Sequence, residues 1–516
     1  MIFMKRRKTS GIAFLSSCLS LVLATITLLA VFAAGPVAAG TVINIGQTSD
    51  ILSFDPHAQN DLGSASVLRH IYDTLVRIGP DNQIVPCLAE SWEITDDSTV
   101  VFKLRPGVKF HNGDPFTAED VKFSLERQKK SARQAYNVAT VEGVEVVDEL
   151  TCRVRLNEPA TGVLLSSLTH YGSGIVGKSA TEKTEAAGKT INDDPIGTGA
   201  YRFVSFKAND RTVIEKNPGY FGQAPANDQL VFKIIPDGSA RTIALETGGI
   251  DLLVNVESVD VKRVRGNKKL FLEEYASTWM EFIILNNAKP PFDKREVREA
   301  IARLVQRDGI IRVAESGEAS PLFSPIASGA YSYTAEVPHY DYDVEKAKAL
   351  LAEGGYPAGF ECKVYLFGEN CSRTAQVLQA LFEEAGIALS VELMERGAYY
   401  DTVGDGVHSM ALGGLISTYD PDATFSPYFY SKSTGRMGNR WFYNSPAADA
   451  LIEGAKREAD PEVRLKMYAD LQRQIIEDVV MVPLYTLNGT VGRRADLKGL
   501  VVYATGQHMY DQLHFE

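Results

Sequence analysis

The chain has 516 residues, of which 65 are acidic and 53 are basic, so its formal net charge is −12. An acidic surface of this kind repels nucleic acid, and we exclude nucleic acid as an expected partner. The length exceeds what one hydrophobic core usually supports, so two or more lobes are expected.

The first 39 residues have the pattern of an export signal. A basic stretch at 5–8 (KRRK) precedes an almost wholly apolar or small run at 11–34, and small residues at 37–39 suit cleavage before Gly40. We predict a signal peptide over residues 1–39 and a periplasmic location. The apolar run is long enough to span a bilayer, so an uncleaved membrane anchor is the alternative. Cleavage would remove four basic residues and leave a net charge of −16.

Strand and helix patterns alternate through the rest of the chain. Alternating or apolar stretches predict strands at 42–47, 100–104, 201–207, 212–216, 250–254, 282–286, 362–367, 389–393 and 479–485. Helical spacing predicts helices at 65–76, 240–248, 296–305, 346–354, 374–384 and 464–476. Thr117, with Asp120 three residues later, predicts a further helix start. Helices and strands mixed in this way indicate an α/β fold.

One stretch matches a catalytic motif by letter. Residues 172–179 (GSGIVGKS) fit the phosphate-binding pattern G-x-x-x-x-G-K-[ST]. The segment before it, 166–171, is polar and short, whereas a phosphate loop follows a buried strand, and an exported protein meets no ATP. We interpret the match as a coincidence. The G-x-S-x-G elbow and the H-E-x-x-H helix are also missing. We therefore expect no enzyme, with no catalytic residues, metal site or cofactor.

Four cysteines lie outside the predicted signal: Cys87, Cys152, Cys362 and Cys371. They lack the C-x-x-C spacing of zinc or redox sites. In an oxidising compartment Cys362 and Cys371 could form a disulfide, since nine positions separate them. Isolated buried thiols are the alternative.

Three aromatic residues stand where a ligand could reach them. Tyr275 and Trp279 come just before the predicted strand 282–286, near an expected lobe crossing, and Tyr419 stands in the loop 418–422 (TYDPD). Aromatic rings beside a few polar groups are typical of small-molecule pockets at domain clefts. We predict ligand contact for these residues, and a core or surface role is the alternative for each.

Several motifs, taken in order, resemble one family. Residues 88–93 (LAESWE), 102–113 (FKLRPGVKFHNG) and 116–121 (FTAEDV) look like the signature of the solute-binding proteins of peptide/nickel ABC importers, extracellular solute-binding protein family 5. Further matches lie at 195–201, 216–220, 249–251, 291–298 and 342–355. The resemblance covers nearly the whole predicted exported chain.

The resemblance implies a two-lobed periplasmic binding protein of type II, in the large cluster with an inserted subdomain. It implies a first lobe at 40–278 plus 483–516, a subdomain inserted at about 60–190, and a second lobe at 279–482. It also implies a monomeric receptor that binds a solute between the lobes and delivers it to the membrane permease subunits of an ABC importer.

The ligand is implied less specifically. In peptide-binding members, an arginine of the second lobe meets the peptide carboxylate, and Arg373 lies at the matching place. An exposed helix-start arginine is the alternative. Those members use an aspartate for the peptide ammonium, but Ser417 lies at that place and cannot form this ion pair. Asp420 or Asp422 could substitute, although an aspartate beside proline more often caps backbone groups.

We therefore predict ligand contacts for Tyr275, Trp279, Arg373 and the loop that contains Ser417, Thr418, Tyr419, Asp420 and Asp422. Together with residues 439–443 (NRWFY), this loop looks most like glutathione- and peptide-binding members. The expected ligand is a short peptide or a peptide-like solute such as glutathione. A nickel chelate, an opine or a sugar on the same fold is the alternative, and an exported hydrolase is the alternative from another class.

Overall fold

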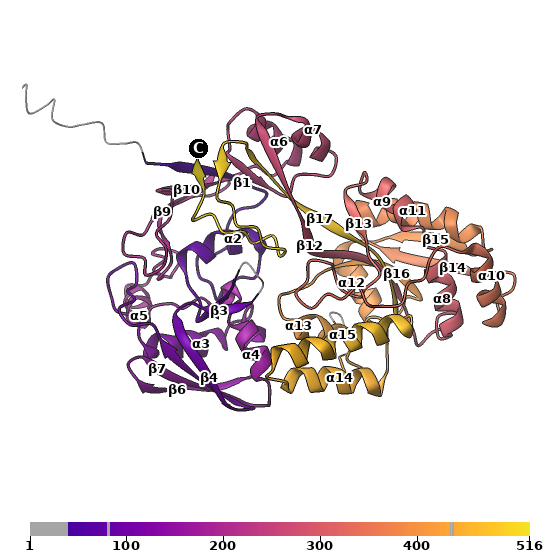
Figure 1. Ribbon diagram of the computed structural model, residues 1–516, viewed down its shortest axis with the longest axis horizontal. Helices are drawn as coiled ribbons and strands as arrows, with labels where there is room; N and C mark the ends of the chain where they lie inside the picture. Colours follow the sequence, from indigo (N-terminus) through magenta and orange to yellow (C-terminus); the bar gives the residue numbers. More distant parts are fainter. Residues whose placement is uncertain (1–39, 80–82, 434, 436–437) are drawn as a thin grey trace, which may run out of the picture. The chain divides into compact units, whose positions relative to one another are not determined.

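The computed structural model describes residues 40–79, 83–433, 435 and 438–516 (Figure 1). The predicted signal peptide, residues 1–39, lies outside these residues. Residues 42–516 pack into one unit. None of the helices within the described ranges is both long and apolar enough to cross a membrane.

The largest element is a mixed sheet of 11 strands. Its spatial order is β15 (Ala388–Leu393), β14 (Glu361–Leu366), β16 (Met410–Ile416), β12 (Leu270–Leu285), β17 (Met481–Arg494), β11 (Leu252–Val254), β1 (Val42–Gln47), β10 (Gln229–Ile234), β9 (Arg211–Lys216) and β8 (Tyr201–Lys207), with β13 (Ala319–Pro321) paired to β17. Helices and strands thus mix in one sheet-centred fold, which confirms the predicted α/β class.

A separate sheet of four strands has the order β4 (Ala89–Asp96), β5 (Thr99–Leu104), β7 (Thr151–Leu156) and β6 (Val141–Asp148). Alternate residues of β5, Val100 and Phe102, are buried and pack with Val121 and Leu125 of helix α3 (Ala118–Gln128). Two further sheets have two antiparallel strands each: β2 (Val76–Ile78) pairs with β3 (Ile84–Pro86), and β18 (Leu497–Lys498) pairs with β19 (His514–Phe515).

Helices line both faces of the sheet around β12, β14 and β16 (Figure 1). Ile283 and Leu285 of β12 share a core with α8 (Arg295–Arg303), α9 (Arg307–Ala314), α10 (Val344–Glu353) and α11 (Glu369–Glu383). Phe282 and Ile284 point to the other face and share a core with α12 (Arg396–Gly404), α13 (Asp422–Phe429), α14 (Pro446–Arg457) and α15 (Pro461–Glu477). Successive side chains of a strand alternate between faces, so β12 contributes to both cores.

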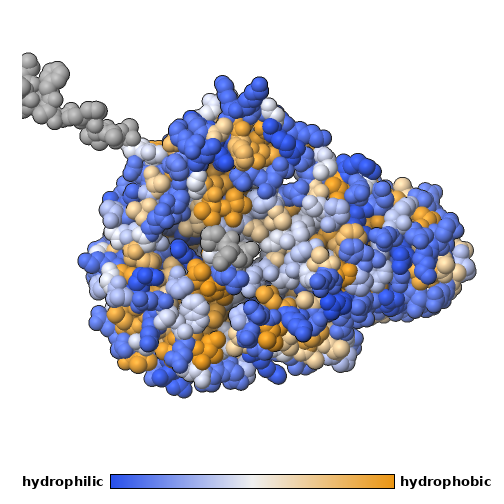
Figure 2. All heavy atoms as spheres, in the orientation of Figure 1, coloured by the Kyte–Doolittle hydropathy of each residue, from blue (hydrophilic) through white to orange (hydrophobic). Residues whose placement is uncertain are grey.

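The remaining helices accompany the other strands. They are α2 (Leu62–Ile71), η1 (Ala135–Val138), α4 (Thr161–Ser167), η2 (Tyr171–Ser173), α5 (Lys178–Ala186), α6 (Gly238–Glu246) and α7 (Val261–Gly266). Hydrophilic residues cover much of the face drawn in Figure 2, with apolar patches among them.

Residues 117–179 contain a predicted helix start and the motif that matches a phosphate loop by letter. The Thr117 backbone N–H donates to the Asp120 carboxylate at 2.9 Å at the start of α3, which confirms the predicted helix start. The motif at 172–179 follows helix α4, where a phosphate loop would follow a strand, and Lys178 pairs with Glu119 at 3.1 Å. This local structure agrees with the interpretation of the match as a coincidence.

The four described cysteines are free and buried, so Cys362 and Cys371 form no disulfide in this structure. Burial raises the pKa of the Cys152 and Cys362 thiols to about 12. Because the thiolate is the reactive form, these two side chains behave as small hydrophobic groups at neutral pH.

Strands β12 and β17 are longer than their sequence patterns predicted. β12 has 16 residues and β17 has 14, and they pair over most of their length. The first half of β12 was missed because it contains Glu273, which is partly exposed, and Glu274, which is exposed, and both break the apolar pattern. The predicted lobe boundaries, 278/279 and 482/483, fall within these two strands.

Candidate functional site

One edge of the main sheet gathers several of the residues singled out in the sequence. Strands β14, β15 and β16 run parallel, so their carboxyl ends meet at this edge. β12 runs antiparallel to β16 and places Trp279 opposite Ile416 at the same edge. In open α/β sheets, ligands bind outside the carboxyl ends of the parallel strands. We call this region, with the start of α11 and the loop after β16, the carboxyl edge.

Trp279 and Glu281 lie two residues apart on β12 and therefore face the same side of the sheet. Trp279 is 42% exposed, whereas Glu281 is only 7% exposed. The indole Nε1 donates to Glu281 Oε1 at 3.1 Å, and the Cys371 thiol lies 3.7 Å from Oε2. Burial raises the pKa of Glu281 to about 7. An exposed aromatic ring thus lies next to a buried carboxyl that titrates near neutral pH.

A glycine on the neighbouring strand makes room for this carboxyl. Gly414 of β16 is the register partner of Glu281. A Cβ atom on Gly414 would lie 2.6 Å from Glu281 Oε1 and 3.2 Å from Trp279 Nε1. Any larger residue at this position would displace the Glu281 side chain.

A second buried acid, Glu315, lies near Glu281. Its carboxylate accepts hydrogen bonds from Ser258 Oγ at 3.3 Å and from the Tyr485 hydroxyl at 3.2 Å. Burial raises the pKa of Glu315, while the charge of Arg373 acts in the opposite direction. The Glu315 charge adds to the effect of burial on the pKa of Glu281.

Arg373 lies in the first half of α11, which begins after β14 and points its amino end to the carboxyl edge. Its side chain is half-buried, and Nε donates to the Ala314 carbonyl at 3.0 Å. One terminal nitrogen donates to Asn370 Oδ1 at 2.7 Å. Arg373 therefore lies at the same edge as Trp279, and protein groups hold its guanidinium in place.

The loop after β16 continues this edge. The Ser417 backbone N–H donates to Thr278 O at 2.8 Å, and the Ser417 hydroxyl is buried without a hydrogen-bond partner. Thr418 is exposed, and its hydroxyl donates to the Asp420 carbonyl at 2.9 Å. Tyr419 is half-buried and stacks on Tyr331, with 4.9 Å between ring centroids.

Asp420 and Asp422 are bound to other protein groups. Asp420 Oδ1 accepts from Arg464 at 2.8 Å and from the Asp422 backbone N–H at 2.7 Å, and its Oδ2 accepts from Ser166. Asp422 accepts from Ser426 and lies 3.5 Å from the Tyr468 hydroxyl. Burial raises the pKa of Asp420, although Arg464 lowers it. Both aspartates thus hold the loop against α4 and α15.

Tyr275 lies on the part of β12 that precedes the carboxyl edge. Its ring packs against His508, and its hydroxyl lies 3.3 Å from His508 Nε2. Gly489 of β17 accommodates this ring, because a Cβ there would lie 2.2 Å from it. Burial raises the pKa of Tyr275 to about 12. Tyr275 thus lies against β17 and the segment around His508.

Two charged residues of this region were not predicted as ligand contacts: Glu281, and Arg440, which the sequence analysis quoted only as part of the stretch 439–443. Arg440 is 3% exposed, and its guanidinium carbon lies 5.5, 5.2 and 5.9 Å from the ring centroids of Tyr400, Tyr428 and Trp441. Its Nε is buried without a hydrogen-bond partner. Cation–π contacts stabilise a guanidinium in such a cage. A charged residue inside an apolar or aromatic run is the sequence signal that both share.

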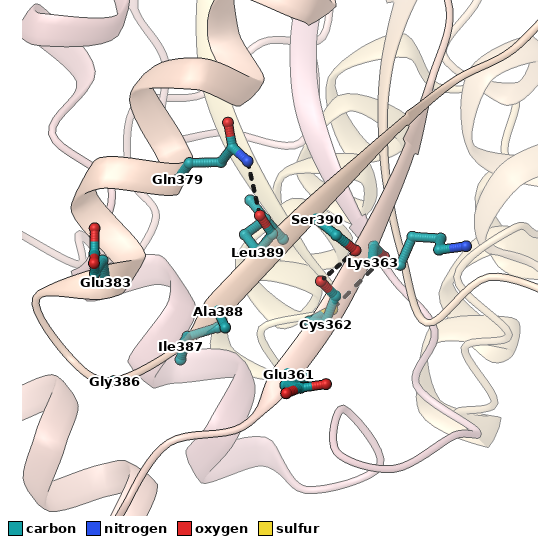
Figure 3. A pocket seen from close by; sticks show the side chains of 10 residues that line it. All are labelled: Glu361, Cys362, Lys363, Gln379, Glu383, Gly386, Ile387, Ala388, Leu389 and Ser390. Atoms are coloured by element: carbon teal, nitrogen blue, oxygen red, sulfur yellow. Dashed lines mark hydrogen bonds between the residues drawn. The ribbon is translucent and has the colours of Figure 1, made fainter.

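An open groove of about 610 Å³ lies at the opposite edge of the sheet (Figure 3). The starts of β14 and β15 and the end of α11 line it, and none of the predicted ligand residues does. Gln379 donates to the Leu389 carbonyl at 2.8 Å, and Ser390 donates to the Cys362 carbonyl at 3.3 Å (Figure 3). Since these polar groups bind each other, the carboxyl edge remains the better candidate site.

Across the described ranges, no three His, Cys, Asp or Glu side chains gather closely enough to hold a metal ion.

Comparisons with known proteins agree with this architecture. A model of the bacterial extracellular solute-binding proteins, family 5, matches residues 83–436. The chain belongs to this family. The glutathione-binding protein GsiB of Pectobacterium atrosepticum is 31% identical over 89% of this chain and 91% of its own length. The heme-binding protein A of Haemophilus influenzae is 30% identical over 84% of each chain.

A solved structure supports the fold of this family 5 member. The periplasmic binding protein DppA from Helicobacter pylori, in complex with the peptide STSA, is 29% identical and superposes with a TM-score of 0.76. The match covers 92% of this chain and 98% of that chain. The fold is therefore that of the two-lobed periplasmic binding proteins, and the chain is a solute-binding protein of the ABC importer type. The glutathione-binding protein, the heme-binding protein and DppA are all named as binding proteins, and none of these three is named as an enzyme.

Proposed function

We propose that this family 5 protein binds short peptides, or a peptide-like solute such as glutathione, and delivers them to the permease subunits of an ABC importer. The binding lobes are residues 40–278 plus 483–516 and residues 279–482, with the subdomain at about 60–190. The protein acts in the periplasm as a monomer, after removal of residues 1–39.

One observation carries the choice of a peptide-like ligand. The carboxyl edge combines an exposed indole, Trp279, with a half-buried guanidinium, Arg373. A peptide offers an apolar body and a carboxylate, which these two side chains complement. A neutral sugar offers no anionic group for Arg373 to bind.

We propose direct ligand contacts for Trp279, Arg373, Ser417, Thr418 and Tyr419. Asp420 and Asp422 have an indirect role. Their carboxylates bind Arg464, Ser166, Ser426 and backbone groups, so they position the loop whose other residues contact the ligand. Tyr275 contributes from the first lobe, where its ring packs against His508.

Mass spectrometry of the small molecules released when the purified protein is denatured tests the ligand class. We expect peptides or glutathione. Released heme, opine, sugar or nickel chelate would overturn the ligand assignment and leave the receptor role intact. Incubation with a peptide library tests the receptor role itself, because a receptor returns every peptide intact and a hydrolase does not.

Substitution of Arg373 tests the carboxylate anchor separately. Arg373→Ala should weaken binding of a peptide with a free carboxylate by at least about 1.5 kcal/mol, since it removes a charged hydrogen bond. Arg312→Ala, at an exposed position of α9, is the matched control and should leave the affinity unchanged. Equal affinities for wild type and Arg373→Ala, measured by calorimetry, would remove Arg373 from the site.

A further inference from the structure

The buried acid at the carboxyl edge has no basic partner. Among the residues that the structure describes, the hydrogen-bond partners of the Glu281 carboxyl are the Trp279 indole N–H and the Cys371 thiol, both of which are neutral. Within the described ranges, no Lys, Arg or His nitrogen lies within 4.0 Å of it. Ionising a buried carboxyl without a cation is unfavourable, and a cation placed next to it would remove much of that cost.

The two acids offered by the loop after β16 are engaged elsewhere. Asp420 pairs with Arg464 at 2.8 Å, and Asp422 accepts from Ser426 and lies near Tyr468. Ser417, at the position expected for an aspartate, carries no charge. Glu281 is therefore the carboxyl of this edge that is next to an exposed surface group, Trp279, and has no cation of its own.

A second buried polar group of this region also has incomplete hydrogen bonding. The Thr374 hydroxyl, one turn along α11 from Cys371, is buried and lies close to the Tyr485 hydroxyl without a hydrogen bond of ordinary geometry. Gly414 leaves the space into which the Glu281 carboxyl projects. Buried polar groups whose hydrogen bonding is incomplete are more typical of a functional site than of a packed core.

We infer that Glu281 is a specificity-determining residue of this receptor, whose carboxylate binds a cationic amine of the ligand, such as the free α-ammonium group of a peptide. This inference rests on the proposed peptide-binding function. It adds that the receptor discriminates between a free and a blocked amino group, and that it does so through β12 and not through the loop after β16.

The surroundings of Glu281 predict how binding depends on pH. The groups that face it are Cys371, Glu315, Tyr399 and Tyr485, with Arg373 beyond Glu315. Burial raises the pKa of each of these thiol, carboxyl and phenol groups, so the cysteine and tyrosines are neutral at pH 6 to 7. A free receptor whose Glu281 has a pKa of about 7 must lose a proton to bind a cation. Affinity should then fall about fivefold from pH 7 to pH 6, where the amine remains charged.

The test uses a synthetic tripeptide library and the same library with N-acetylated amino ends, titrated into the purified protein and analysed by native mass spectrometry. Wild type should bind free tripeptides at least about tenfold more tightly than acetylated ones, a difference that corresponds to one charged contact. Glu281→Gln should lose this preference and the fivefold pH dependence together. Glu145→Gln, at an exposed ion pair of β6 in the separate four-stranded sheet, is the matched control and should keep both.

The outcomes separate this inference from the proposed function. If wild type binds neither library, peptide binding itself fails. If wild type binds both libraries equally, or Glu281→Gln keeps the preference for free amino ends, peptide binding stands and the role of Glu281 is overturned. The comparison of the two libraries on wild type needs no variant, so a folding defect in Glu281→Gln would still leave the inference open to refutation.

Discussion

Two buried acids in the second half of the chain differ in what surrounds them. Asp420 is 6% exposed and Glu281 is 7% exposed, and burial raises the pKa of both. Asp420 pairs with Arg464 and accepts from Ser166 and a backbone N–H. Glu281 has two neutral partners, an indole N–H and a thiol. The carboxyl with a complete set of partners holds protein segments together, and the carboxyl without a cation is suited to a ligand.

The Asp420 cluster also joins distant segments of the chain. Ser166 belongs to α4 and Arg464 to α15, so Asp420 connects elements that are about 250 and about 40 positions away from it. Nearby, Lys456 of α14 pairs with Glu158 at 2.7 Å. These contacts fix the loop after β16, which carries Ser417 and Tyr419, relative to α4.

The largest expected effect comes from breaking the Asp420 cluster. Arg464→Ala leaves Asp420 buried without its cation, and we expect the free energy of unfolding at pH 7.5 to fall by about 3 kcal/mol or more. Urea denaturation followed by circular dichroism measures this change. Arg473→Ala, which breaks the exposed pair with Asp470, should cost less than about 1 kcal/mol. Equal losses in the two variants would contradict a structural role for the buried pair.

Glu281 should show the opposite effect on stability. Its pKa is raised from 4.5 to about 7, so between these values the unfolded chain is ionised while the folded chain holds the proton. The contribution of Glu281 to the free energy of unfolding therefore falls by about 3 kcal/mol as pH rises from 4.5 to 7. In Glu281→Gln this pH-dependent loss of stability is absent, because glutamine does not ionise. The variant should match wild type near pH 4.5 and be more stable by up to about 3 kcal/mol at pH 8 in the absence of ligand.

Comparison of the two urea series over this pH range isolates Glu281, because every other titrating group is common to both proteins. A variant less stable than wild type at pH 8 would mean that the carboxylate is stabilised in the folded protein, contrary to its surroundings.

A smaller effect should follow from filling the space opposite Glu281. Gly414→Ala places a Cβ 2.6 Å from Glu281 Oε1, and the side chain must shift. We expect a loss of about 1 to 3 kcal/mol in the free energy of unfolding, as for other overpacked sites, and a weaker preference for free amino ends. Gly143→Ala is the matched control, since its Cβ would meet nothing within 4 Å. If both variants behave alike, the close approach at Gly414 is not a constraint.

The smallest expected effect concerns the surface pair near the Asp420 cluster. Lys456 and Glu158 are 29% and 49% exposed at their side chains, so Lys456→Ala should change the free energy of unfolding by less than about 1 kcal/mol. The change should shrink further in 1 M salt, which screens exposed charges. A loss as large as that of Arg464→Ala would show that exposure does not distinguish the two pairs.

Much of the fold followed from local sequence patterns. The predicted strand at 42–47 is β1, and the Thr117 and Asp120 pattern begins α3, because short-range alternation and capping depend on neighbours in the chain. The ordered family motifs were sufficient to identify the fold and the importer-type receptor, because each motif is a continuous stretch of chain. The first half of β12 was missed because its pairing with β17, more than 200 positions away, compensates for exposed glutamates.

For the candidate site, too, the sequence predicted some features and only the tertiary structure decided others. The sequence by itself determined that Trp279, Arg373 and the loop 417–422 are ligand candidates, because their residue types and family positions are visible in the chain. Only the tertiary structure decided that Asp420 binds Arg464, 44 positions later, and that Glu281 lies buried against Cys371, 90 positions later. Whether a carboxylate can bind a ligand depends on its burial and on nearby opposite charges. Both arise from contacts between distant segments of the chain.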